Sequence, residues 1–112
     1  MGESPLDMQI LSLGCRDWIL FGEVEQRFRD AHSLSPREDA IAWIVRFAHQ
    51  GWLIAGNYDG QFITWTETGK NLELKMRWWL RADPVDPLGP VMTLMFELTR
   101  SGREAIPNQQ RF

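Results

Sequence analysis

The amino-acid sequence predicts a single α+β domain, in which three helices precede a small antiparallel sheet and a further helix is inserted between two of its strands. A length of 112 residues is typical of one domain. Hydrophobic residues make up 44% and charged residues 24%, which is ordinary for a globular protein. Apolar residues recur at helical spacing up to residue 50 and at strand spacing soon afterwards, and this change of period predicts the order of the elements.

The first half of the chain carries signals for three helices, with a brief strand or turn at 18–21. The third helix has the clearest start, because Ser35 is suited to the N-cap, Pro36 to the first helical position and Glu38 to the positive end of the helix dipole. Gly51 is the expected C-cap. The three predicted helices span residues 5–13, with Ser4 as N-cap, 22–31 and 36–50.

The second half alternates short strands with helices. A fourth helix is predicted from Thr66, as N-cap, to Arg81, because Leu72 and Met76 recur on one face together with Trp79. The three prolines of 82–90 predict a loop. The other predicted segments are a strand at 52–56, a turn at 57–60, a strand at 61–65, a strand at 91–98, a short helix at 101–106 and a polar tail at 107–112.

Several functional classes are disfavoured by composition. Cys15 is the single cysteine and neither histidine is at metal-ligand spacing, so no disulfide, zinc site or other cofactor is predicted. Neither a secretory signal nor an apolar run of membrane-spanning length is visible, which predicts a cytoplasmic protein with no membrane partner. No phosphate-binding loop or nucleophile motif is present, and His32 and His49 stand alone, so the chain is not expected to be an enzyme or to have a small-molecule site.

Two passages resemble winged helix-turn-helix domains. Residues 47–54, FAHQGWLI, resemble the end of a winged-helix third helix, where glycine turns the chain into the first wing strand. Residues 96–105, FELTRSGREA, are similar to the Leu-Thr-x-x-Gly passage of bacterial regulators of the multiple-antibiotic-resistance and phenolic-acid-regulator types. The resemblance implies a winged-helix fold, with Thr99 as a cap and Gly102 as a turn.

The chain departs from these regulators between the two wing strands. Their strands are joined by a short turn, whereas residues 57–90 intervene here and contain a predicted helix. Gly60-x-Phe62-x-x-Trp65, the helix ending in tryptophan and the last strand also resemble small uncharacterised bacterial proteins, a likeness that implies no activity.

DNA binding is the function that the winged-helix resemblance implies, and the helix 36–50 would carry it. Its candidate contacts are Arg37, Arg46 and His49. Residues 36–51, however, hold two arginines against Glu38 and Asp39, so the segment is formally neutral, and the whole chain has a net charge of −3. This balance disfavours nucleic acid as the partner without excluding it.

Positive charge concentrates on the predicted helix within residues 57–90. At 100° per residue, its outer face carries two apolar residues, Leu74 and Trp78, among cations. The other five tryptophans fall where at least partial burial is expected, which leaves Trp78 as the candidate binding residue. An alternative is that Leu74 and Trp78 pack under the loop 82–90. The candidate partner-binding residues are Lys70, Leu74, Arg77, Trp78 and Arg81.

The sequence therefore predicts a non-catalytic domain that binds a protein. We expect it to occlude or neutralise a partner, as an immunity-type protein does with a toxin, or to associate with itself. The alternative is a DNA-binding transcription regulator that uses the helix 36–50. The identity of the partner, the oligomeric state and the role of the tail 107–112 stay open.

Overall fold

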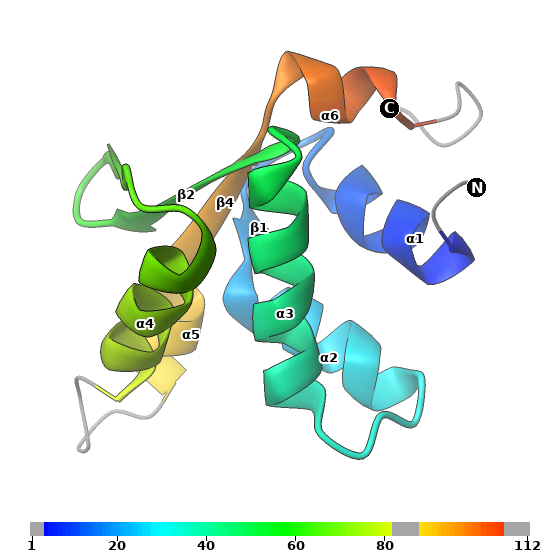
Figure 1. Cartoon of the computed structure of the whole chain (residues 1–112), viewed down its shortest axis with the longest axis horizontal. Helices are drawn as coiled ribbons and strands as arrows, with labels where there is room; N and C mark the ends of the chain where they lie inside the picture. Colours follow the sequence, from blue (N-terminus) through cyan, green and yellow to red (C-terminus); the bar gives the residue numbers. More distant parts are fainter. Residues whose placement is uncertain (1–3, 82–87, 107–112) are drawn as a thin grey trace.

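Helix α3 (Pro36–His49) lies at the centre of the fold in the computed structural model, with the sheet behind it and α1 and α2 to one side (Figure 1). The structure describes residues 4–81 and 88–106. It is an α+β arrangement, and the other described elements are α1 (Pro5–Leu13), β1 (Ile19–Leu20), α2 (Phe21–Asp30), β2 (Leu53–Tyr58), β3 (Phe62–Thr64), α4 (Gly69–Leu80), α5 (Leu88–Thr93), β4 (Leu94–Leu98) and α6 (Arg100–Glu104).

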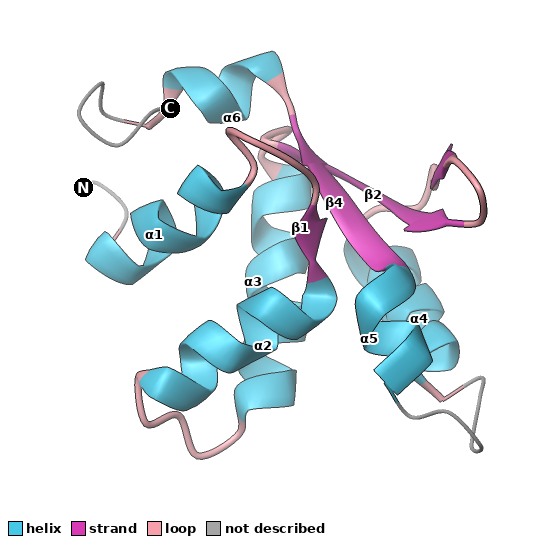
Figure 2. Cartoon of the chain, turned by 180° about the vertical axis from the view of Figure 1, so that it is seen from behind, coloured by secondary structure: helices cyan, strands magenta, loops and turns pink. Residues whose placement is uncertain are grey.

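The four described strands form one antiparallel sheet in the order β1-β4-β2-β3. The strands predicted at 52–56 and 61–65 form a hairpin of β2 and β3, which pair through Asn57 and Ile63, but β2 continues two residues into the predicted turn 57–60. Phe96 of β4 stands opposite Ile19 of β1 and Ala55 of β2, and all three side chains are buried. Figure 2 shows the sheet from the side opposite α3. The sheet therefore buries one face against α3 and joins segments from both halves of the chain.

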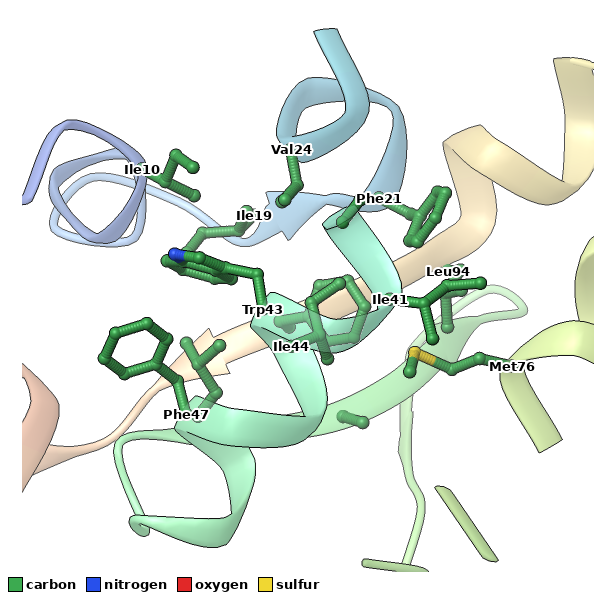
Figure 3. Packing of buried hydrophobic residues seen from close by; sticks show 14 of the residues in the cluster. Ile10, Ile19, Phe21, Val24, Ile41, Trp43, Ile44, Phe47, Met76 and Leu94 are labelled. Carbon is green, nitrogen blue, oxygen red and sulfur yellow. The ribbon is translucent and has the colours of Figure 1, made fainter. Parts of the chain in front are cut away.

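The core forms where α3 meets α2, α4 and the sheet (Figure 3). Ile41, Ile44 and Phe47 of α3, which recur at helical spacing, are almost completely buried. Trp43 is also buried, whereas Ala48 of the same helix is half-buried. Because burying a large apolar side chain stabilises the fold by about 1.5–3 kcal/mol, this face of α3 contributes much of the stability.

A buried hydrogen bond joins α1 to α3. The indole Nε1 of Trp43 donates to Oδ1 of Asp7 over 2.9 Å. Asp7 also completes a capping box with Ser4, since the backbone N–H of Ser4 donates to Oδ2 of Asp7 and the Ser4 hydroxyl accepts from the Asp7 N–H. The predicted helix 5–13 and its cap are thereby confirmed, but its buried face contains Asp7, Ile10 and Leu11 and leaves Leu6 and Leu13 half-buried.

The described part of the segment between the paired strands β2 and β4 contains β3 and two helices, where one helix was predicted. Residues 88–93, assigned by sequence to the loop and the last strand, form α5, so β4 begins only at Leu94. Pro90 is compatible with this short helix because it occupies the first turn, where backbone N–H groups have no intrahelical partner. Residues 82–87 of the predicted loop lie outside the described residues.

Two predicted helix starts need correction, and that of α3 is confirmed. The second helix begins at Phe21, where the carboxylate of Glu23 accepts from the backbone N–H of Leu20. Helix α3 begins at Pro36 with Ser35 as N-cap, as predicted, although the Ser35 side chain makes no capping hydrogen bond. The N-cap of α4 is Thr68 and not Thr66. These shifts follow from local hydrogen bonds and backbone geometry that apolar spacing does not specify.

The Leu-Thr-x-x-Gly passage joins β4 to α6 by close packing. Thr99 caps α6 as expected, because its hydroxyl oxygen accepts from the N–H of Gly102, and the hydroxyl donates to the carbonyl of Gly51. Gly102 lies inside α6 and does not form a turn. A Cβ atom there would stand 2.4 Å from the carbonyl oxygen of Trp52, so this close approach requires glycine. The described helix ends at Glu104, earlier than predicted, and the tail 107–112 lies outside the described residues.

We predict that Asp7→Ala lowers the free energy of unfolding by about 2–4 kcal/mol, because it removes a helix cap and leaves the buried Trp43 N–H unpaired. Urea denaturation measures the loss. Gln9→Ala, at an exposed position of the same helix, is the matched control and is expected to change stability little. Asp7→Asn, which keeps an acceptor for the indole, is expected to lose less than Asp7→Ala. Equal effects of Asp7→Ala and Gln9→Ala would contradict this role.

Candidate functional site

The outer face of α4 exposes two large apolar side chains one helical turn apart. Leu72 and Met76 of the same helix are completely buried, whereas Leu74 is 53% and Trp78 is 59% exposed. The Trp78 ring stands edge-on to the Trp79 ring, with centroids 6.2 Å apart. Leu74 and Trp78 are therefore not part of the core; the alternative in which they pack under the predicted loop 82–90 depends on residues 82–87, which lie outside the described residues.

The tryptophan next to Trp78 is anchored in the fold. The indole N–H of Trp79 donates to the carbonyl of Pro90 and to the hydroxyl of Thr93, both in α5. Its ring also packs against the buried Trp65. Trp78 thus rests on a fixed support. The partial or complete burial expected of the other tryptophans is confirmed for Trp18, Trp43, Trp52, Trp65 and Trp79.

The cations of the candidate surface differ in how they are paired. Arg77 makes a bidentate ion pair with Glu38 of α3, at 2.7 and 2.8 Å, and its Nε donates to Glu73 over 3.1 Å. Lys70 is 3.5 Å from Glu73. Arg81 is exposed and makes no ion pair with any residue that the structure describes. Much of the positive charge predicted for α4 is therefore neutralised within the fold.

The Arg77–Glu38 ion pair shifts the pKa values of both side chains. Hydrogen bonding from Arg77, followed by the charges of Arg77 and Arg37, holds the pKa of the Glu38 carboxyl below its ordinary value of 4.5. Hydrogen bonds to Glu38 and Glu73 raise the pKa of Arg77. The pair joins the first turn of α3 to α4. Sequence reasoning missed the role of Glu38, and only the helical spacing of Glu73 from Arg77 signalled part of this network.

Two of the three candidate DNA contacts on α3 are engaged within the protein. Nε of Arg37 donates to Glu25 over 2.8 Å. Arg46 lies 3.6 Å from Asp7, with its guanidinium 4.6 Å from the centroid of the Phe47 ring. His49 is exposed in the last turn of the helix.

One candidate DNA contact and two of the candidate partner-binding residues come together at a hollow between α3 and α4. Arg37 and Ile41 of α3, with Arg77, Leu80 and Arg81 of α4, line a hollow of about 150 Å³ between the helices. Arg46 and His49 do not line it. The structure therefore brings one candidate DNA contact next to the surface predicted to bind protein.

Comparison with protein-family models, curated proteins and solved structures found no significant match. Within residues 4–81 and 88–106, no helix is long and apolar enough to cross a bilayer. The same residues contain no group of three or more histidine, cysteine or acidic side chains arranged to hold a metal ion. The assignment of function rests on the surfaces described above.

We predict that Arg77→Gln lowers the melting temperature at pH 7 and that the difference from wild type shrinks in acid. The pKa of Glu38 is depressed in the folded state, so its ion pair stabilises the fold above the ordinary carboxyl pKa. This stabilisation is lost as the pH falls through the lower, folded-state pKa. Thermal denaturation at pH 7 and at about pH 3 measures both differences.

Arg81→Gln provides the matched control for this experiment, since it removes an arginine from the same helix that makes no ion pair within the described chain. We expect its effect to be small at both pH values. Arg77→Gln could also lower the melting temperature by the same amount at pH 7 and in acid. That result would show that the Arg77 side chain stabilises the fold by packing and not through Glu38.

Proposed function

We propose that this chain is a cytoplasmic, non-catalytic domain that binds a partner protein through the outer face of α4. The observation that supports this most is the exposure of Trp78, a large aromatic side chain that lies beside the equally exposed Leu74. Exposed apolar patches rimmed by polar groups mark interaction sites, and tryptophan and arginine are enriched at binding hot spots. We name this the α4 surface, and its residues are Lys70, Leu74, Arg77, Trp78 and Arg81.

The α4 surface is largely pre-organised. The Trp79 hydrogen bonds fix the support of the Trp78 ring, and the Arg77–Glu38 pair fixes α4 against α3. Binding therefore needs little ordering of the backbone beneath the two apolar side chains, which lowers the entropic cost of association. A protein that covers and neutralises a partner such as a toxin would use a surface of this kind.

We further propose that the framework is a winged helix with an insertion. Three N-terminal helices, the strand β1 between α1 and α2, and the antiparallel pairing of β4 with both β1 and β2 support this proposal. In that framework β2 and β4 are the wing strands, and β3, α4 and α5 are inserted between them. The α4 surface then lies on the inserted segment and not on the third helix.

The alternative function is a DNA-binding regulator that uses α3. The exposure of His49 and the partial exposure of Arg37 and Arg46, whose side chains are 45% and 48% exposed, favour it. The ion pairs of both arginines and the acidic residues in the first turn of α3 oppose it. Protein binding through α4 has the stronger support, because its apolar pair has no comparable role within the fold.

We predict that Trp78→Ala abolishes association with the partner while reducing stability by only about 1 kcal/mol, the scale of one aromatic contact. The tagged chain is isolated from the cells that produce it, and the proteins recovered with wild type and variants are compared by quantitative mass spectrometry. Tyr58→Ala removes another exposed aromatic side chain, on the sheet, and is expected to retain the partner.

Thermal denaturation separates the two possible roles of Trp78. Trp43→Ala, in the core, is expected to cost about 3–5 kcal/mol. A comparable loss in Trp78→Ala would make Trp78 a core residue. Recovery of the same partner with Trp78→Ala as with wild type would also contradict the proposal.

We predict no salt-sensitive binding of duplex DNA. Gel-shift measurements at low salt with pooled genomic fragments test this, because binding through phosphate contacts weakens steeply as salt is added. A shift that disappears with added salt and in Arg37→Ala/Arg46→Ala, with circular dichroism showing that this variant is folded, would favour the regulator and contradict protein binding as the main function.

A further inference from the structure

The hollow between α3 and α4 has the size of a site for one side chain. Its volume of about 150 Å³ is well below the roughly 300–1,000 Å³ of sites for cofactors and drug-sized ligands. Ile41, which is buried, and Leu80, which is half-buried, supply its apolar lining. Three arginines, Arg37, Arg77 and Arg81, complete it. The hollow thus combines an apolar lining with guanidinium groups.

Only one of these guanidinium groups lacks a carboxylate partner within the described chain. Arg37 is paired with Glu25, and Arg77 with Glu38 and Glu73. Arg81 makes no such pair. The positive charge of Arg81 therefore has no carboxylate beside it among the described residues. A ligand with a single negative charge would balance it.

Arg81 also connects the hollow to the apolar part of the α4 surface. It follows Trp78 by three residues and Arg77 by four, so the three side chains are neighbours on the helix. A partner that covers Trp78 therefore comes within reach of Arg81. Arg81 thus lies between the hollow that it lines and the side of α4 that carries Trp78.

We propose that this hollow receives the carboxylate of a glutamate or aspartate side chain from the bound protein. Arg81 forms the ion pair with this carboxylate, and Ile41 and Leu80 contact its aliphatic stem. A carboxylate fits better than a phosphate, because one unpaired guanidinium matches one negative charge. This inference rests on the proposed function and defines the chemistry of the partner, which places an acidic side chain next to the apolar group that covers Trp78.

The test is a nuclear magnetic resonance titration of the full chain with a capped peptide, acetyl-Leu-Glu-Glu-Leu-amide, and with its glutamine counterpart. We expect the glutamate peptide to shift the Nε–Hε resonance of Arg81 and the methyl resonances of Ile41 and Leu80 with saturation. We expect binding to be about five- to tenfold weaker for the glutamine peptide, and similarly weaker for the glutamate peptide with Arg81→Gln, the scale of one net hydrogen bond.

Lys70→Gln is the matched control, since it removes a cation from the same face of α4 but away from the hollow. It is expected to bind the glutamate peptide within about twofold of wild type. Equal binding of the two peptides, or unchanged binding by Arg81→Gln, would overturn the carboxylate inference. Free glutarate or inorganic phosphate that binds as tightly as the peptide would overturn it too, because the hollow would then be a site for a small anion.

The same titration separates this inference from the proposed function. Weaker peptide binding in Trp78→Ala but not in Arg81→Gln would overturn the carboxylate site and leave the α4 surface standing. Weaker binding in Arg81→Gln, together with loss of the cellular partner in Trp78→Ala, supports both. A third outcome is that the peptide binds saturably at Arg81 while Trp78→Ala still retains the cellular partner. This outcome would contradict the proposed function. It would also contradict the assignment of the carboxylate to that partner.

Discussion

The buried hydrogen bond between the Trp43 indole and the Asp7 carboxylate sets the position of α3, on which the rest of the fold is arranged. A carboxylate taken out of water is costly unless its oxygens are bonded, and Asp7 meets this condition through Ser4, Trp43 and the nearby Arg46. The helix is thereby tied to α1 on one side, while its apolar side chains meet the sheet on the other. Arg46 of α3 thereby offsets the charge of a carboxylate on α1 that the fold has buried.

Ion pairs also connect the start of α3 to the neighbouring helices α2 and α4. At the start of α3, Arg37 pairs with Glu25 of α2, and Glu38 pairs with Arg77 of α4. These contacts hold α4 with its buried face on the core and its opposite face, with Leu74 and Trp78, toward the solvent. The charged groups of α3 thus position the inserted helix. The surface available for binding arises on α4 for that reason.

Local signals in the sequence were sufficient to predict many of the helices and strands. The helices at 5–13 and 36–50 and the hairpin of β2 and β3 depend on caps, apolar periodicity and turn residues, all of which act over a few positions. Helix α5 could not be found in this way. Its sequence, Leu88–Thr93, contains glycine, proline and β-branched residues, and it is held by hydrogen bonds from Trp79, which belongs to another helix. The start of β4 was misplaced for the same reason.

The candidate site was predictable in its apolar part but not in its charges. Helical geometry places Leu74 and Trp78 opposite Leu72 and Met76 without any tertiary information, whereas the pairing of Arg77 with Glu38 joins residues 39 positions apart. A surplus of cations in one segment therefore overstates its positive potential. After pairing, α4 and the adjoining hollow present an apolar pair and the guanidinium of Arg81, which has no carboxylate partner among the described residues. A phosphate backbone needs several unpaired cations in a row, whereas one apolar anchor beside one carboxylate is a pattern that a protein surface supplies.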